Sequence, residues 1–323
     1  MEYRKFGRTN WPVSEIGYGM WGMAGWTESS DIQSAKSLDV AVENGVTFFD
    51  TAWGYGEGHS EELLGQLVRR HPSQKLYTAS KIPPKNFQWP AKPEYAFEDS
   101  YPTSHIMEYT EKTLKNLGLE QIDLMQFHTW DDGWSHREEW QRAIEDLKTS
   151  GKIGAMGISV NRWEPENGIK ALKTGMLDAV QVIYNIFDQA PEDVLFPLCD
   201  QLNIGVIARV PFDEGTLTGN LTKETIFPEG DWRGTYFVPE NLNSSVDHAD
   251  ALRPLIPEHM TMAEMALRFI TMNTSVSTII PGMRKERNVL ANVATSDGKG
   301  LSKELHQELK KHRWDRTPTE WSQ

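Results

Sequence analysis

The sequence has a single cysteine, Cys199, among 323 residues, so no disulfide can form within the chain. It contains no run of 18 apolar residues, the length that a helix needs to cross a membrane. The opening MEYRKFGRTN carries charges and no apolar core, so we expect no secretory signal there. These absences exclude a disulfide-rich secreted domain and a membrane-spanning protein, and we expect a protein of the reducing cytoplasm.

Basic residues are in the minority. Lys and Arg number 33 and Asp and Glu number 46, which gives a formal net charge of −13. Such a charge disfavours binding to nucleic acid or to anionic membranes. The histidines lack the paired spacing that is typical of metal sites, so we expect no metal. Tryptophan, in contrast, is abundant: there are 12, and its flat surface and single N–H donor often line pockets.

Short apolar runs alternate with amphipathic stretches along the chain. The runs predict β-strands near residues 14–19, 46–50, 75–81, 122–128, 152–159, 179–185, 204–210 and 276–282. The amphipathic stretches predict helices near 31–44, 59–70, 103–117, 135–150, 164–174, 191–203, 261–273, 284–295 and 302–313. Strands followed by helices predict a parallel α/β fold, and eight such units predict a (β/α)8 TIM barrel in one domain, residues 1–323.

Two further segments complete the predicted fold. Residues 3–5 and 12–15 predict a short N-terminal hairpin. Residues 211–245 predict a long loop on the carboxyl-terminal face of the barrel, and long loops of this kind are usually functional or disordered. Its aromatic residues Trp232, Tyr236 and Phe237 favour an ordered cover.

Polar side chains follow several of the predicted strands where each strand ends. Among them are Asp50, Lys81, His128 and Arg209. The carboxyl ends of all strands in a (β/α)8 barrel meet at one mouth, so we expect these side chains to converge.

Asp50, Tyr55, Lys81 and His128 together suit proton transfer to a carbonyl oxygen. A tyrosine with a pKa of about 10 is a poor acid, and a nearby Lys81 ammonium would lower that pKa. Asp50 would supply the counter-ion that a buried lysine needs, and a neutral His128 would hydrogen-bond the carbonyl. Each residue alone has an ordinary structural interpretation, so the prediction rests on all four.

Residues 17–22 spell GxGxxG, the pattern of dinucleotide-binding Rossmann folds. In those folds the glycines open a helix at once. Here the next predicted helix begins only near Asp31, so we do not interpret these glycines as a dinucleotide fingerprint.

Over essentially its full length the sequence resembles the aldo-keto reductases. The matching segments, in the family's order, are YRKFGRTNWPVSEIGYG, FFDTAWGYGEGHSEELLG, YTASK, TLKNLGLEQIDLMQFH, GISV, VQVIYN and IIPGMRKERNVLAN. The resemblance implies a (β/α)8 barrel that binds NADP(H) without a Rossmann domain. It also implies NADPH-dependent reduction of aldehydes or ketones, with the tetrad Asp50, Tyr55, Lys81 and His128 and with Tyr55 as the proton donor.

The resemblance further implies the residues that bind the cofactor. Ser159 and Gln181 would hold the nicotinamide carboxamide, while Arg284 would face the 2′-phosphate and Asn288 and Asn292 the adenine. The other implied contacts are Gly19, Met20, Trp21, Asp50, Arg209, Val210, Pro211, Phe212, Gly215, Leu217, Gly282 and Met283.

Three positions depart from the family's pattern. Arg209 stands where an aromatic residue normally stacks on the nicotinamide, and Glu214 stands where many relatives have an arginine. We expect Arg209 to lie near the nicotinamide, paired in part with Asp213 or Glu214. Asn161 comes one residue later than the asparagine that the family commonly has after its serine, so its role stays open.

Trp21, Trp53 and Trp130 are predicted to wall the substrate pocket. The expected partner is a small carbonyl compound, and nothing in the sequence predicts the oligomeric state. Because a fold does not fix a function, the same barrel could instead serve as a regulatory or binding subunit that senses the cofactor.

Overall fold

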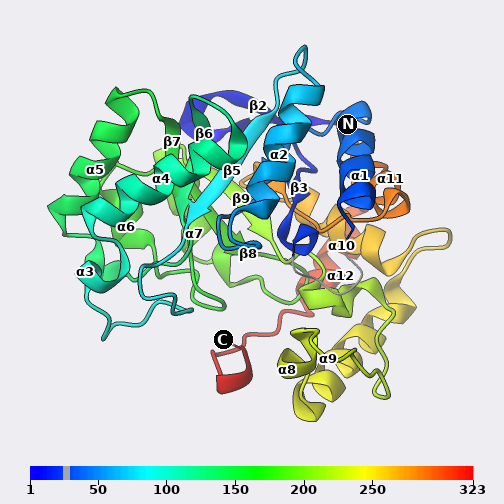
Figure 1. The fold of residues 1–323 in the computed structure, drawn as a ribbon. Helices are drawn as coiled ribbons and strands as arrows, with labels where there is room; N and C mark the ends of the chain where they lie inside the picture. Colours follow the sequence, from blue (N-terminus) through cyan, green and yellow to red (C-terminus); the bar gives the residue numbers. More distant parts are fainter. Residues whose placement is uncertain (25–29, 323) are drawn as a thin grey trace.

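Eight parallel strands form a barrel in a computed structural model that describes residues 1–24 and 30–322 (Figure 1). Around the barrel they are β3 (Tyr18–Gly19), β4 (Phe48–Asp50), β5 (Tyr77–Ile82), β6 (Ile122–Phe127), β7 (Ile153–Ser159), β8 (Ala179–Ile183), β9 (Gly205–Arg209) and β10 (Thr278–Ile279). Parallel bridges between Ile16 and Ile279 and between Gly19 and Gly282 join the two edges. The predicted (β/α)8 barrel is confirmed.

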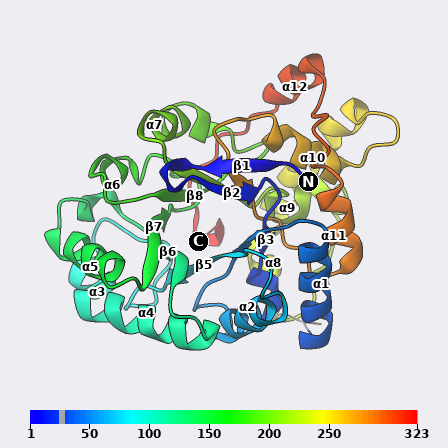
Figure 2. The same cartoon turned by 90° about the horizontal axis from the view of Figure 1, so that it is seen from above.

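Helices surround the barrel (Figure 2). They are α1 (Asp31–Glu43), α2 (His59–Arg70), α3 (Phe97–Ser100), α4 (Thr103–Leu117), α5 (Glu138–Thr149), α6 (Ile169–Lys173), α7 (Leu195–Leu202), α8 (Arg233–Tyr236), α9 (Pro239–Leu252), α10 (Met262–Thr271), α11 (Glu286–Val293) and α12 (Lys303–Lys310). In α5 the residues Trp140, Ala143, Ile144 and Leu147 are buried, which is the spacing of one helix face. No helix within the described ranges has both the length and the apolar character needed to span a membrane.

The predicted N-terminal hairpin closes one end of the barrel (Figure 2). It consists of β1 (Tyr3–Phe6) and β2 (Trp11–Ser14), which pair antiparallel. Phe6 is fully buried, and its ring stacks on Trp11 at 5.8 Å and on Phe48 of β4 at 5.4 Å between centroids. Aromatic packing therefore seals this end.

The inward positions of the strands change from apolar to polar along the barrel. Side chains two residues apart on a strand face the same side, so Phe48 and Asp50 both point inward. The apolar layer forms a buried cluster with the hairpin and contains Phe48, Tyr77, Ala79, Leu124, Ala155, Ala179 and Ile207. Two residues beyond Phe48, Ala79, Leu124, Ala179 and Ile207 stand, in that order, Asp50, Lys81, Gln126, Gln181 and Arg209. A polar layer thus lies at the carboxyl ends of the strands.

The predicted long loop is partly helical. Its residues 233–236 form α8, and α9 already begins at Pro239. Tyr236 and Phe237 are buried in a small cluster with Leu242 and Val246, so the segment is an ordered cover as expected. Figure 1 shows α8, α9 and the C-terminus together at the end of the barrel opposite the hairpin.

Candidate active site

The four predicted catalytic side chains meet at the polar end of the barrel. Lys81 Nζ lies 2.5 Å from Asp50 Oδ2 and 3.4 Å from the hydroxyl of Tyr55. It also donates to the backbone carbonyl of Thr51 at 2.7 Å. The rings of Tyr55 and His128 meet edge to face, with centroids 5.6 Å apart. A lysine, its counter-ion and a phenol are therefore in direct contact beside an imidazole.

The segment after β4 explains how Tyr55 reaches this site. Gly56 and Gly58 have φ of 68° and 98°, values that glycine adopts without steric cost, so the chain turns sharply before α2. The first turn of α2 is anchored by Glu61, a buried residue that accepts a hydrogen bond from Ser80 on β5 at 2.5 Å. The loop is thus fixed on both sides of Tyr55.

Two glutamines hold Asp50 in place. Gln126 and Gln181 each donate an amide N–H to Asp50 Oδ1, at 3.0 Å and 2.9 Å. Gln126 is absent from the sequence-based prediction, although it lies two residues before His128 and so faces the same interior. Gln181 also donates to Gln126, at 3.2 Å, so both of its amide hydrogens are used within the protein.

Burial dominates the electrostatics of Tyr55. It raises the pKa of Tyr55 above the ordinary value of about 10, and the Lys81 ammonium offsets this only in part. Burial acts to lower the pKa of Lys81, but attraction to Asp50 and Tyr55 outweighs it and the pKa is raised. The expected lowering of the Tyr55 pKa is therefore not seen, because burial is the larger effect. Tyr55 stays protonated and Lys81 charged at neutral pH.

The His128 ring is neutral at physiological pH. Burial lowers its pKa well below the usual value, and the charges of Lys81 and Arg209 lower it further. Its Nδ1 has no hydrogen-bond partner in the part of the chain that the structure describes. Trp89 packs edge-on against the same ring, with centroids 5.7 Å apart. A neutral imidazole can donate one hydrogen bond to a carbonyl oxygen.

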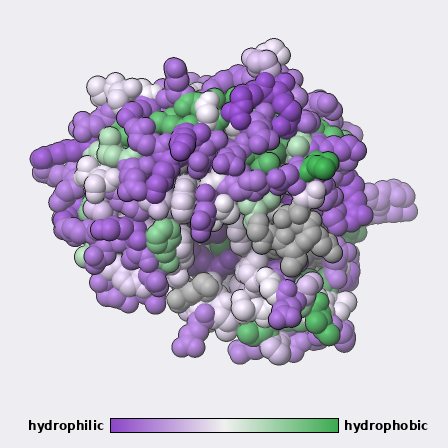
Figure 3. Space-filling view, viewed as in Figure 1, coloured by the Kyte–Doolittle hydropathy of each residue, from purple (hydrophilic) through white to green (hydrophobic). Residues whose placement is uncertain are grey.

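A cavity of about 1010 Å³ opens at the tetrad, and Figure 3 shows the hydrophilic surface hollowed near the middle of the view. The predicted residues that line the cavity are Gly19, Met20, Trp21, Asp50, Tyr55, His128, Gln181, Arg209, Val210, Pro211, Phe212, Gly215, Gly282, Arg284 and Asn288. Lys285 and Arg287 line it beside Arg284. The cavity thus connects the tetrad to three cations at the start of α11.

Other predicted residues lie outside the cavity wall: Lys81, Ser159, Leu217, Met283, Asn292, Trp53 and Trp130. Trp130 is fully buried in a core cluster with Phe127, Trp134 and Trp140, and Trp53 packs against Tyr109 at 4.8 Å. Besides Tyr55 and Trp21, the Trp, Tyr and Phe residues that line the cavity are Trp89, Phe212, Trp232, Tyr236 and Trp321. Most of these residues lie on loops or in the C-terminal segment. The hydrophobic periodicity of the sequence predicts helices and strands but not the positions of such segments.

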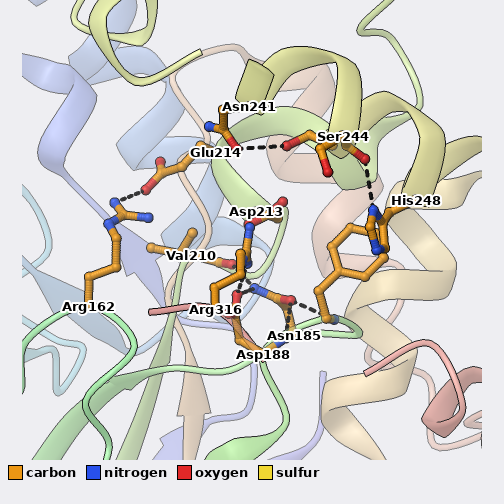
Figure 4. Close-up of polar contacts among 12 residues, drawn as sticks. Arg162, Asn185, Asp188, Val210, Asp213, Glu214, Asn241, Ser244, His248 and Arg316 are labelled. Atoms are coloured by element: carbon orange, nitrogen blue, oxygen red, sulfur yellow. Dashed lines mark hydrogen bonds and ion pairs between the residues drawn. The ribbon is translucent and has the colours of Figure 1, made fainter. Parts of the chain in front are cut away.

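Arg209 enters the cavity from β9, and no carboxylate of residues 1–24 and 30–322 forms an ion pair with it. Its Nη2 donates to the backbone carbonyl just after β7 at 3.1 Å, and its Nε has no partner among the described residues. The two acids expected beside it bind elsewhere: Glu214 pairs with Arg162 and Asp213 with Arg316 (Figure 4). Burial and the charge of Arg162 lower the pKa of Arg209 to about 10, so it stays charged at neutral pH.

Asn161 uses its side chain to join loops. Its amide nitrogen donates to the Ala91 carbonyl at 2.9 Å and to Glu164 at 2.7 Å. Its amide oxygen accepts from Thr129 at 2.8 Å and from the Ala91 N–H at 3.3 Å. With both ends of the amide bonded, Asn161 acts as a connector of loops at the cavity wall.

Comparison with known proteins agrees with this geometry. Residues 15–313 match the Aldo/keto reductase family. The chain is 27% identical over 306 residues to the NADH-specific methylglyoxal reductase of Escherichia coli (strain K12), with 89% of this chain and 91% of that protein covered. It is 28% identical to a probable voltage-gated potassium channel subunit beta of Oryza sativa subsp. japonica, with 92% of each covered. The structure of a glycerol dehydrogenase from Gluconobacter oxydans superposes with a TM-score of 0.80 at 26% identity, covering 96% of this chain and 94% of that one. The chain therefore belongs to the aldo/keto reductase family.

Proposed function

We propose that the protein reduces aldehydes or ketones to alcohols with NADPH. The observation that carries this proposal is the contact of Lys81 with both Asp50 and Tyr55 beside a neutral His128, at the wall of a large cavity. A small carbonyl compound with its oxygen between Tyr55 and His128 would meet a proton donor and a hydrogen-bond donor together.

Each tetrad residue has a distinct part in this reaction. A bound nicotinamide cofactor would supply the hydride to the carbonyl carbon. Tyr55 would donate its phenolic proton to the carbonyl oxygen, and the Lys81 ammonium, 3.4 Å away, would stabilise the phenolate that remains. Asp50 would keep Lys81 charged in its buried position, and His128 would hold the carbonyl oxygen toward Tyr55.

The cavity suits NADP(H), because cations gather at one end of it. Arg284, Lys285 and Arg287 line the cavity where α11 begins. A helix N-terminus attracts anions, and the three cations beside it add to the attraction for a phosphate group. The family alone does not decide the cofactor, since the Escherichia coli relative is named NADH-specific.

Turnover of NADPH and of NADH with a panel of aldehydes and ketones tests the proposal. We expect reduction with both simple and aromatic aldehydes, and a kcat/KM for NADPH at least about tenfold above that for NADH, the scale of one charge-assisted hydrogen bond. A preference for NADH would contradict the cofactor assignment.

A second candidate function is a regulatory subunit that binds the cofactor without turnover. It is supported by the full-length match to a probable potassium channel subunit beta. Tight NADPH binding with no reduction of any compound in the panel would favour this candidate over the enzyme.

A further inference from the structure

We propose that Arg316 is a positioning residue that holds the turn at residues 210–215 in the conformation that the cofactor needs; this role rests on the proposed function. Arg316 lies in the C-terminal tail, defined here as residues 311–322, after α12. The family match ends at residue 313, so Arg316 lies outside the matched segment.

The turn at residues 210–215 has a strained backbone. Val210, Asp213 and Glu214 have φ of 55°, 45° and 58°. Positive φ is uncommon outside glycine, and for a β-branched residue such as Val210 it is a steric outlier. Such a conformation persists only when surrounding contacts hold it. Because Val210 and Gly215 line the cavity, those contacts also shape the site.

Five residues form a closed ring of polar contacts around this turn (Figure 4). The carbonyl of Val210 accepts from Asn185 Nδ2 at 3.0 Å and from the backbone N–H of Asp213 at 3.1 Å. Asn185 Nδ2 also donates to Asp188 Oδ2 at 2.9 Å. Arg316 Nη2 then donates to Asp188 Oδ2 at 2.6 Å and to Asp213 Oδ1 at 2.8 Å. Arg316 thus closes the ring between the segment after β8 and the turn after β9.

The guanidinium of Arg316 is itself fixed by aromatic rings. Its side chain is 5% exposed and lies over the rings of Trp163, at 4.6 Å, and Trp314, at 4.5 Å. The ring of Trp314 in turn stacks on His248 of α9, with centroids 3.9 Å apart, and the backbone N–H of Trp314 donates to the Phe187 carbonyl at 2.9 Å. Packing of the tail therefore holds the guanidinium of Arg316 beside the turn.

The two carboxylates of the ring depend on this cation. Asp188 and Asp213 are both buried. Burial raises the pKa of Asp188 and the nearby Asp213 raises it further, while Arg316 acts in the opposite direction. Without Arg316 the two carboxylates would repel each other or bind a proton. Either outcome removes the salt bridge that joins the segment after β8 to the turn, and the turn is then left with the Asn185–Val210 and Arg162–Glu214 side-chain contacts.

Hydrogen exchange of the protein without cofactor tests the first part of the proposal. The amides of Asp213, Gly215 and Leu217 donate to carbonyls within the turn. In Arg316→Met we expect these amides to exchange at least about tenfold faster, while the amides of β9 keep their rates. Arg316→Lys, which keeps the charge but not the planar fork, should give an intermediate rate.

Equilibrium titration with NADPH tests the second part. The apparent dissociation constant rises by the factor by which the competent conformation is depopulated, so in Arg316→Met we expect an increase of about tenfold or more. The KM for NADPH should rise more than kcat falls, because Arg316 does not touch the tetrad.

Arg313→Met is the matched control. Arg313 lies in the same tail and pairs with Asp193 and Asp315, away from the turn. We expect its exchange and NADPH dissociation constant to stay within about twofold of wild type, as for a surface ion pair.

Three outcomes would overturn the proposal: unchanged exchange of the Asp213, Gly215 and Leu217 amides in Arg316→Met, faster exchange spread evenly over the whole chain, or faster exchange of these amides with unchanged NADPH affinity. Failure of the wild-type protein to bind NADPH would instead contradict the proposed function. In that case the exchange rates still decide whether Arg316 holds the turn.

Discussion

The two ends of the barrel are built from the same strands but have opposite chemistry. At the hairpin end, Phe6 and Phe48 pack with no charged group between them. Two residues further along β4 and β5 lie the buried charges of Asp50 and Lys81. Apolar burial stabilises the fold wherever it occurs, whereas a buried charge is retained only with a partner and here serves chemistry. Stability and reactivity should therefore be separable by substitutions at the two ends.

Phe6→Ala, at the hairpin end of the barrel, should lower the stability of the protein more than any other substitution considered. Phe6→Ala should lower the free energy of unfolding by about 3–5 kcal/mol, the usual cost of removing a buried phenyl ring. Lys5→Ala, on an exposed side chain of the same strand, should change it by less than about 0.5 kcal/mol. Urea unfolding measures both. If Phe6→Ala folds but binds NADPH more weakly than wild type, stability and cofactor binding cannot be assigned to separate ends of the barrel.

Tyr55→Phe tests the chemistry at the cavity end of the barrel. Loss of a general acid should lower kcat for carbonyl reduction roughly 10²-fold or more. NADPH affinity should be retained. The free energy of unfolding should change by less than about 1 kcal/mol, because the hydrogen bond that is lost is long, at 3.4 Å, and Lys81 keeps Asp50 and the Thr51 carbonyl as partners. Steady-state kinetics and urea unfolding provide the two measurements. Reduction at the wild-type rate would rule out Tyr55 as the proton donor.

Arg284→Ala separates cofactor binding from proton transfer, because it removes a cation of the cavity wall that is not part of the tetrad. It should weaken NADPH binding by about 1.5–3 kcal/mol, the value of hydrogen bonds to a charged group, and leave NADH binding almost unchanged. Fluorescence titration with each cofactor measures this. Equal losses for the two cofactors would show that Arg284 supports the fold and not the 2′-phosphate.

The smallest change that we expect is in the pH dependence of the free energy of unfolding. The pKa of His128 in the folded protein is well below its unfolded value of about 6.5. Below that value the unfolded chain binds a proton that the folded chain does not, so His128 makes stability fall as the pH falls. Between about pH 7 and about pH 5.5 this contributes about 1 kcal/mol. Urea unfolding at both pH values should show a loss in wild type that exceeds that in His128→Gln by this amount; identical losses would contradict a buried neutral ring.

Much of the fold could be predicted from the sequence, because strand and helix periodicities repeat in alternation. Each of the eight barrel strands, and each strand of the hairpin, lies inside its predicted range or extends at most one residue beyond it. The strand ends are less well predicted: the runs at 14–19 and 276–282 form only the two-residue strands β3 and β10. Closure of the barrel there uses isolated bridges at Ile16 and Gly19, which depend on the partner strand.

The residue types at the mouth of the barrel could be predicted from the order of amino acids alone. Asp50, Lys81 and His128 follow apolar runs, and parallel strands bring such positions together whatever their separation in the chain. Only the folded chain shows which side chains face the cavity and which charges form pairs. Trp130 turned into the core while Trp89 lines the cavity, and Asp213 paired with Arg316 and not with Arg209. These contacts depend on loops and on the C-terminal tail. Arg316 and Asp213 are 103 residues apart in the sequence. Contacts between such distant segments leave no periodic signal in the sequence.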